Sequence, residues 1–271
     1  MREVYEGCNI ETYLKRIGFT GEAKADLETL NKIQELHVIS VPYENLEIMA
    51  RKPITLDIPA VYEKIVTRGR GGYCFELNGL YAWLLEEIGY KITQHFGRWL
   101  RGEALVSPMR RHRVIRIPLD GQEYICDVGV GMTAPRRPLV FKFDTIQEIG
   151  DESYRIVHHP ENIYVVEYLS SSGDFKPLYC FNDDPCLPID YFQAHYYCTT
   201  HPESIFLNDT MVYRRTEKGR YTILDAYDQN TGNKVKELKR LEDGIWKTTL
   251  LRSDKELDQA LRTYYGFGLD T

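Results

Sequence analysis

One cysteine in this sequence stands where a thiol can become a nucleophile. Cys74 follows the turn Gly71-Gly72-Tyr73 and opens a run with strong helical periodicity, in the stretch RGRGGYCFELNGLYAWLLEEIGY (residues 68–90). A thiol reacts as its thiolate, and the partial positive charge and free N–H groups of a helix N-terminus favour that form. Glycines also allow a substrate to approach the backbone closely. Cys74 is therefore a candidate nucleophile, although a packing residue, a metal ligand or half of a disulfide also fits this local context.

A nucleophilic cysteine needs a base, and the base needs an acid that orients it. His112 lies in the strand-like run RHRVIRI, and Asp127 ends the next strand-like run in YICDVGVG. The pair Asp120-Gly121 between these runs predicts a tight hairpin turn, which would bring the two strands side by side. A surface histidine and a turn aspartate are the simpler readings of each residue alone. Together the three residues favour a Cys-His-Asp triad.

The elements that must position these residues change in kind along the chain. The first ninety residues predict helices over 9–18, 25–40, 56–69 and 74–90, with Asn9 as an N-cap. Alternating patterns then predict strands over 91–106, 111–131, 162–181 and 210–225, with a short helix over 189–200. A last helix is predicted over 253–266, capped by Ser253. Helices, then strands, then a mixed tail indicate an α+β protein.

Composition excludes several classes of function. The 271 residues carry a net charge of −6 without a long single-sign run, which argues against nucleic acid or an anionic membrane as the partner. No signal-peptide pattern and no apolar run of about 20 residues is present, so we expect a cytoplasmic protein. The six cysteines, at positions 8, 74, 126, 180, 186 and 198, are scattered and are expected to be mostly free thiols.

Longer motifs make the sequence resemble the arylamine N-acetyltransferase family. They are RGGYCFELN at 70–78, VPYENL at 41–46, and DVGVG at 127–131 followed by Pro138-Leu139, with 38 residues from Cys74 to His112 and 15 more to Asp127. The resemblance runs over nearly the whole chain. It implies an α+β fold with a cysteine-protease-like catalytic core. The expected parts are a helical bundle carrying the nucleophile (1–90), a β-barrel carrying His and Asp (91–200) and an α/β lid (201–271).

The resemblance also implies a reaction, of a kind used in xenobiotic metabolism. Cys74 would take the acetyl group from acetyl-CoA and pass it to an arylamine, arylhydrazine or N-hydroxyarylamine, in a ping-pong sequence. His112 would hold the thiolate and move protons, and Asp127 would orient His112. No metal is expected. Tyr43, Tyr73 and Val130 are the expected pocket residues. Because the family usually has an aromatic residue where this chain has Val130, the acceptor preference is open.

Basic residues near the catalytic positions are candidates for the phosphates of CoA. They come from the stretches PMRRH and GVGMTAPRRPL, while two threonines are carried over from family positions in the lid. A solvated basic surface is the simpler reading of the arginine pairs. Arg70, Glu44 and Asn45 are expected to tie the first helices to the nucleophile turn. The full set expected to contact CoA is Met109, Arg110, Arg111, Gly131, Arg136, Arg137, Thr210 and Thr216.

Two rival functions remain open at this point. A thiol hydrolase or a transglutaminase-like acyltransferase uses the same Cys-His-Asp logic with another acceptor. A zinc-binding interaction module is the more remote alternative, with Cys180, Cys186, His195 and Cys198 as its ligands. Their spacing fits poorly, because zinc ligands usually come in close pairs.

Overall fold

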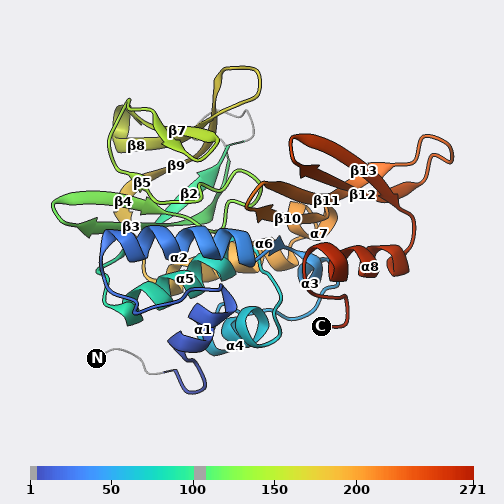
Figure 1. Ribbon diagram of the computed structural model, residues 1–271, viewed down its shortest axis with the longest axis horizontal. Coiled ribbons are helices and arrows are strands. Elements are labelled where there is room, and N and C mark those ends of the chain that lie inside the picture. The colour runs from blue at the N-terminus through green and yellow to red at the C-terminus, as the bar shows by residue number, and fades with distance from the viewer. Residues whose placement is uncertain (1–4, 101–107) are drawn as a thin grey trace.

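The N-terminal region is helical, as predicted. A computed structural model describes residues 5–100 and 108–271 (Figure 1). The predicted cap at Asn9 is confirmed, because its side chain accepts a hydrogen bond from the Thr12 N–H at 2.9 Å. Asp26 caps the next long helix in the same way, at 2.8 Å from the Thr29 N–H. The helices are α1 (Ile10–Arg16), α2 (Leu27–Ser40), α3 (Leu46–Met49), α4 (Ile58–Tyr62) and α5 (Cys74–Ile88).

The segment predicted as one helix over 56–69 divides in two. After α4 the chain forms a π-helical turn, Glu63–Thr67, in which the Arg68 N–H reaches back to the Glu63 carbonyl at 2.9 Å. The wider turn buries three consecutive residues, and one of them is Lys64. A regular amphipathic helix would not bury three in a row, so this turn is what directs a lysine into the interior.

An eight-stranded antiparallel sheet follows and closes almost into a barrel. Its order is β5-β4-β3-β2-β9-β8-β7-β6, and the Gln147 side chain joins the two edges by bonding to the N–H and carbonyl of Val140 at 2.7 and 2.8 Å. The predicted Asp120-Gly121 hairpin is confirmed, with φ of 51° and 76° at the turn. The strands are β2 (Thr93–Trp99), β3 (Arg110–Leu119), β4 (Gln122–Cys126), β5 (Leu139–Val140), β6 (Gln147–Ile149), β7 (Glu152–His159), β8 (Ile163–Leu169) and β9 (Phe175–Pro185). The end of the strand expected over 91–106 lies partly outside the described residues.

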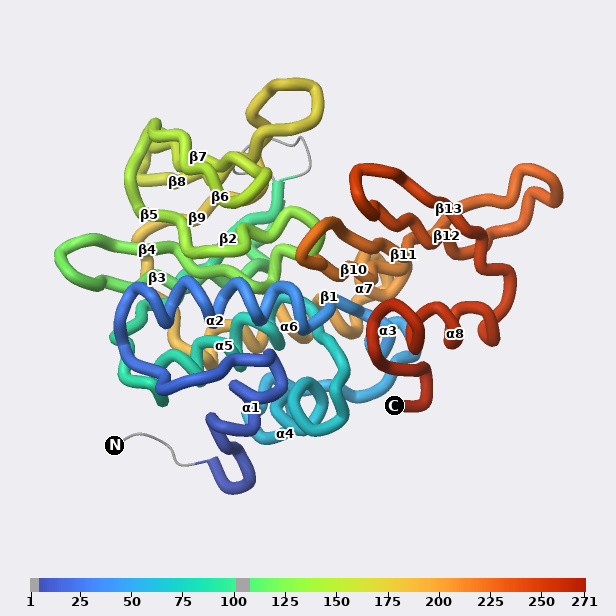
Figure 2. The backbone as a smooth tube through the Cα atoms, viewed as in Figure 1, coloured from blue at the N-terminus to red at the C-terminus, as the bar shows by residue number. Residues whose placement is uncertain are grey.

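A five-stranded antiparallel sheet, here called the lid sheet, occupies the C-terminal region together with α8 (Figure 2). Its first strand comes from the N-terminal region, so the two ends of the chain share one sheet. The three-part division at residues 90 and 200 stays a prediction. The lid strands are β1 (Tyr43–Glu44), β10 (Met211–Thr216), β11 (Gly219–Tyr227), β12 (Lys234–Glu242) and β13 (Ile245–Leu251). The remaining elements are α6 (Tyr191–Thr200), α7 (Ile205–Asn208), α8 (Asp254–Tyr264) and the 3₁₀ turns Pro160–Asn162 and Pro188–Asp190.

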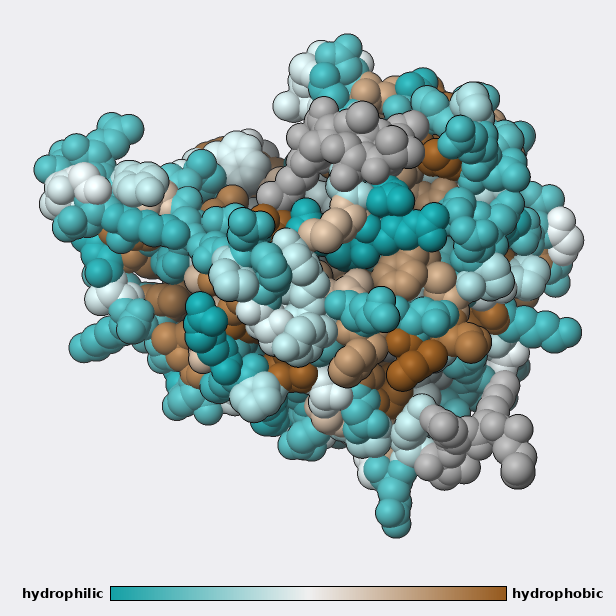
Figure 3. All heavy atoms as spheres, turned by 180° about the vertical axis from the view of Figure 1, so that it is seen from behind, coloured by the Kyte–Doolittle hydropathy of each residue, from teal (hydrophilic) through white to brown (hydrophobic). Residues whose placement is uncertain are grey.

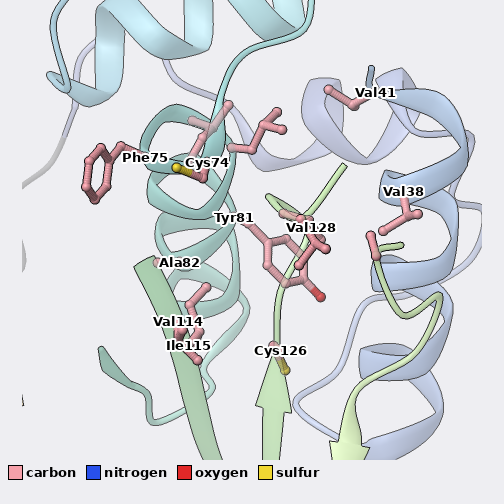
Figure 4. Close-up of a cluster of buried hydrophobic side chains, with 14 of the residues drawn as sticks. Val38, Val41, Cys74, Phe75, Tyr81, Ala82, Val114, Ile115, Cys126 and Val128 are labelled. Atoms are coloured by element: carbon pink, nitrogen blue, oxygen red, sulfur yellow. The ribbon is translucent and has the colours of Figure 1, made fainter. Parts of the chain in front are cut away.

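The main core lies between the helices and the eight-stranded sheet. Helix α5 is buried from its first residue to Leu85, and it packs against β3. Figure 4 shows Cys74 at the start of α5, Cys126 at the end of β4, and Val128 just beyond it. Hydrophilic residues cover much of the face seen in Figure 3, with hydrophobic ones in separate patches. None of the helices within the described residues has the length and apolar character that a membrane span requires.

Candidate active site

The nucleophile turn is held by the backbone of the segment before β1. The Gly72 N–H donates to the Pro42 carbonyl at 3.3 Å, and the Glu44 N–H donates to the Gly72 carbonyl at 2.9 Å. A Cβ on Gly71 would lie only 2.1 Å from the Pro42 oxygen. The glycines are therefore required by this close backbone packing, whereas the sequence suggested approach by a substrate. Tyr73 is the N-cap residue of α5, which places Cys74 at the first helical position.

Buried charges brace the turn from behind. The predicted contact between Arg70 and Glu44 is present at 3.2 Å, with both side chains almost fully buried. Lys64 adds a bond to Glu76 at 2.8 Å, and Glu76 accepts the Tyr73 N–H at 3.1 Å, completing the start of α5. Burial raises the pKa of Glu76, and the Lys64 ammonium opposes that shift. The sequence did not reveal Lys64 as a partner, because only the π-helical turn brings it inward.

His112 and Asp127 meet as the hairpin predicts. The His112 Nε2 lies 2.5 Å from the Asp127 Oδ2, and both side chains are buried. The other carboxylate oxygen accepts hydrogen bonds from the Asn78 side-chain amide at 2.8 Å and from the Gly129 N–H at 2.9 Å. Asp127 is thus fixed on both oxygens, and the ring of His112 is fixed by Asp127.

Asn78 joins the helix of the nucleophile to the strands of the other two residues. It lies one helical turn after Cys74, and its amide also donates to the Arg113 carbonyl at 2.6 Å and accepts from the Val128 N–H at 2.9 Å. The partners follow His112 and Asp127 directly in the chain. Asn78 is the last residue of the motif RGGYCFELN, but the sequence analysis assigned it no function. Its position four residues after Cys74 places it on the same helix face, and this spacing could have indicated its role.

The thiol of Cys74 lies beside the backbone of Arg111, the residue that precedes His112. Its Sγ donates to the Arg111 carbonyl at 3.5 Å, and Cys74 and His112 line the same cavity. The loop after Asp127 packs directly on the nucleophile, since a Cβ on Gly129 would lie 2.8 Å from the Cys74 Cα. Cys74 and His112 therefore line one cavity, and Asp127 is bonded to His112.

Burial dominates the protonation of Cys74. It raises the pKa of the thiol well above its ordinary value, and the neighbouring Cys198 and Asp127 add to this, while the Phe75 N–H and Arg111 oppose it. The N–H of Phe75 at the helix N-terminus lowers the pKa of the Cys74 thiol, as predicted, but burial raises that pKa by more. A reactive thiolate therefore requires a nearby base to take the proton, and His112 is the base that lines the cavity.

The cavity lined by Cys74 and His112, here called the reaction cavity, has a volume of about 290 Å³ and mostly apolar walls. Tyr43 and Val130, the two residues predicted to contact the acceptor, are on its wall, and their contact with an acceptor stays a prediction. Tyr73 is not among the lining residues that the structure describes: it is fully buried, and its hydroxyl lies 2.5 Å from the Nδ1 of His195. Sequence reasoning missed other wall residues, which come from distant segments: Trp99, Leu100, Met132, Thr133, Tyr168, Pro177, Leu178, Ile205, Phe206, Met211 and Tyr213.

The arginines predicted to bind CoA have different surroundings. Arg111 lines the cavity. Arg110 is a partly exposed side chain 3.7 Å from Asp184. Arg136 donates to two carbonyls of the β10–β11 turn, at 2.8 and 3.0 Å, and Arg137 pairs with Glu35 at 3.3 Å. The structure thus brings one of the four to the reaction cavity and places the other three outside its described wall.

The other predicted CoA contacts also divide. Gly131 adopts φ of +81° beside the ring of Tyr213, which lines the cavity. Thr210 is buried within the lid, where its hydroxyl donates to Asp225 at 3.0 Å. Thr216 ends β10 and offers its carbonyl to Arg136. Met109 is 45% exposed. Asn45 was expected at the nucleophile turn but bonds instead to the backbone of Phe206, Asp209 and Met211 at 2.8 Å each.

The zinc alternative finds no support in the part of the chain that the structure describes. No three His, Cys, Asp or Glu side chains there come together as a possible metal site. His195, one of the four proposed ligands, is used by Tyr73 and by the Ile54 carbonyl at 3.2 Å. The six cysteines, all within the described residues, are free thiols.

Comparison with known proteins decides the family. A family model described as N-acetyltransferase matches residues 26–271. An arylamine N-acetyltransferase of Mycolicibacterium smegmatis is 34% identical over 216 residues, which is 78% of this chain and 78% of that protein. The chain belongs to the arylamine N-acetyltransferase family. The liver isozyme of arylamine N-acetyltransferase from Gallus gallus is 28% identical and covers 97% of this chain and 96% of its own length.

Solved structures of arylamine N-acetyltransferases share the fold. The Mycobacterium smegmatis enzyme superposes with a TM-score of 0.86 at 29% identity, covering 97% of this chain and 94% of its own. The Mycobacterium marinum enzyme in complex with CoA has a TM-score of 0.84 at 26% identity, covering 96% of this chain and 93% of its own. The predicted fold class of helical bundle, β-barrel and α/β lid is confirmed, and the protein is an acyltransferase.

Proposed function

We propose that this protein transfers an acetyl group from acetyl-CoA to the nitrogen of small aromatic amines through an acetyl-Cys74 intermediate. The observation that carries the proposal is the buried His112–Asp127 pair, whose histidine lines the same cavity as Cys74. Family membership supports the reaction class, and the CoA complex of the Mycobacterium marinum relative supports acetyl-CoA as the donor. No metal takes part in the proposed reaction. The cytoplasmic location stays a prediction.

In the first half-reaction His112 takes the proton of Cys74, and the thiolate attacks the carbonyl carbon of the acetyl thioester. Asp127 stabilises the protonated ring of His112 without itself taking the proton. The C–S bond to CoA breaks, the leaving thiolate receives the proton from His112, and Cys74 carries the acetyl group. Because burial raises the pKa of Cys74, proton transfer within the ion pair is more favourable than release of the proton to water.

In the second half-reaction the acceptor nitrogen attacks the acetyl-cysteine. His112 takes a proton from the nitrogen and returns it to the sulfur of Cys74, which regenerates the free enzyme. The apolar wall formed by Tyr43, Val130 and Phe206 suits an aromatic ring. Arylamines, arylhydrazines and N-hydroxyarylamines fit this description. Val130 leaves room where the family usually has an aromatic side chain, so we expect bulkier rings to be accepted.

The predicted CoA residues are proposals of unequal strength. Arg111 lines the reaction cavity and is the arginine best placed to meet the donor. Gly131 lies against the cavity wall through Tyr213. Thr210 is buried in the lid, and Arg136 and Arg137 bond to protein groups, so we expect smaller effects from them.

An acetyl-enzyme experiment tests the proposal. The protein is incubated with acetyl-CoA without acceptor, and intact-mass and peptide spectra locate any adduct. We expect one acetyl group on Cys74, lost on addition of an arylamine with formation of the N-acetyl product. Cys74→Ser serves as the control that folds but forms no thioester. No adduct, together with hydrolysis of amides or transfer to protein amines, would instead support the thiol hydrolase or transglutaminase-like alternative.

A further inference from the structure

A second cavity continues outward from the reaction cavity. Its volume is about 440 Å³, and it shares Met132, Thr133 and Tyr168 with the wall around Cys74. The far side is formed by the start of β7, the β8–β9 loop and the lid. Figure 2 shows the β12–β13 hairpin of the lid sheet pointing toward the eight-stranded sheet. A substrate whose reacting nitrogen reaches Cys74 can therefore extend into this outer cavity.

The outer cavity differs in chemistry from the inner one. Trp246 of β13 is 51% exposed, lines the cavity and is paired with Leu241 of β12. The polar residues Ser153 and Ser171 and the acidic residue Asp151 also line the wall. The inner wall is mostly apolar, so the two cavities suit two ends of one molecule with different polarity.

Most of the charged side chains at and near this wall pair with one another. Arg215 holds Glu152 through two bonds of 2.7 and 2.8 Å, and Arg220 lies 3.4 Å from the same carboxylate. Burial lowers the pKa of Arg215, but Glu152 and, more weakly, Tyr154 and Asp151 raise it above its ordinary value. Asp151 forms no hydrogen bond or ion pair with any residue that the structure describes. The described wall carries Arg220 together with the acidic residues Asp151 and Glu152, so it is not a strongly positive site for several phosphates. Asp151 and the face of Trp246 are the groups left to meet a ligand.

We infer that the outer cavity is a subsite for acceptors whose aromatic amine carries a cationic tail. This rests on the proposed function, because the aromatic amine must occupy the inner cavity. An ammonium group attracts both an indole face and a carboxylate. The tail would lead from the boundary at Met132 and Tyr168 into the outer cavity, whose wall includes Trp246 and Asp151. The subsite thus selects among acceptors and plays no part in acetylation of Cys74.

A matched pair of acceptors tests this inference. One is a p-aminobenzamide whose amide carries a diethylaminoethyl tail, and the other replaces the tail nitrogen with CH, so that only the charge differs. We expect the wild-type kcat/KM to be about fivefold to tenfold higher for the cationic acceptor, falling as salt is added. Trp246→Ala and Asp151→Asn should each reduce this preference to about twofold or less. Ile245→Ala and Glu148→Gln are the controls, because both residues are exposed and neither belongs to the described lining of the cavity.

Two results would overturn the inference while leaving the proposed function in place. One is equal kcat/KM for the two acceptors in the wild type. The other is a slower acetylation of the enzyme by acetyl-CoA in Trp246→Ala, which would assign the outer cavity to the donor. Unsubstituted aniline reports on the proposed function separately: it should be acetylated equally by wild type and both variants, and its failure to react in the wild type would count against the function itself.

Discussion

A single buried amide holds the reactive residues of this enzyme together. Asn78 contacts the carboxylate of Asp127 and the backbone on both strands, and it stands on the helix that carries Cys74. Water does not reach these buried polar groups, so each of these hydrogen bonds satisfies a group that would otherwise be unpaired. The geometry of the triad is therefore set by a neutral residue that takes no part in proton transfer.

Asn78→Ala should impair catalysis more than binding. Loss of the amide leaves the Val128 N–H unpaired and removes one donor from Asp127, so the carboxylate and the ring of His112 lose their fixed orientation. We expect the rate of Cys74 acetylation to fall about tenfold to a hundredfold, with little change in the KM for acetyl-CoA and a shifted pH–rate profile. Asn182→Ala, on β9, is the control. A lower amount of folded enzyme with an unchanged pH profile would show a structural role alone.

At the scale of elements, the helix of the nucleophile and the hairpin of the base and acid were predictable. Glycines just before and just after the helical pattern mark the ends of α5, and Asp120-Gly121 marks the β3–β4 hairpin. The pairing of β1 with β10 was not predictable, because two residues carry no periodicity and their partner lies far along the chain. Sequence reasoning missed the cavity walls formed by Trp99 and Phe206, the role of Lys64 and the burial of Thr210 within the lid for the same reason. Tertiary packing decides them, whereas local pattern decides the helix and the hairpin.

The contact between the nucleophile turn and the segment just before β1 gives a sharp steric test. The methyl group added in Gly71→Ala would overlap the Pro42 carbonyl, because its carbon would lie 2.1 Å from that backbone oxygen. We expect a loss of about 2–4 kcal/mol in the free energy of unfolding, together with loss of activity as Cys74 moves. Gly173→Ala, at an open loop with φ of +86°, should show only about 1 kcal/mol from backbone strain and keep its activity. Equal effects of the two substitutions would contradict this account.

The helical bundle carries a pH sensitivity of its own. His37 is fully buried among α1, α2 and α5, against Tyr13 and Tyr81 and near Arg16, and both ring nitrogens lack partners among the described residues. Burial lowers its pKa to about 3, with a further contribution from Arg16. The unfolded chain binds a proton near pH 6.5 and the folded chain does not, so stability is lost as pH falls from about 6.5 toward 3.

The size of this effect follows from the pKa difference. At two pH units below the ordinary histidine pKa, His37 lowers the free energy of unfolding by at most about 2.7 kcal/mol. His37→Phe should remove this part of the acid sensitivity, measured as the free energy of urea unfolding at several pH values. His158→Phe, on β7 of the eight-stranded sheet, is the control and should leave the pH dependence unchanged. An equal pH dependence in wild type and His37→Phe would show that other groups cause the acid sensitivity.

At the scale of the whole molecule, the reaction cavity exists because the lid sheet docks on the eight-stranded sheet. The inner wall takes Met132 from the loop after Asp127, Tyr168 from β8 and Tyr213 from β10. The bond from Arg215 of β10 to Glu152 of β7 links the two sheets, while Asn45 bonds to the backbone around α7. The cavity is thus assembled from parts that are far apart in sequence, and its shape depends on a few contacts between them.

The Arg215–Glu152 pair should couple lid docking to activity. Arg215 also donates to the Met132 carbonyl at 3.1 Å, so its loss loosens a residue shared by both cavities. We expect Glu152→Gln to destabilise the protein by about 2–4 kcal/mol, because it leaves the buried charge of Arg215 without its carboxylate, and Arg215→Met to cost less, because Glu152 keeps Arg220 as a partner. The double variant should be less destabilised than the sum of the singles, with a coupling of about 1–3 kcal/mol. Both singles should raise the KM for acceptor and donor alike, since the wall between them moves. Additive effects on stability in the double-mutant cycle, with unchanged KM values, would mean that the lid is held by its apolar contacts and β1 pairing instead.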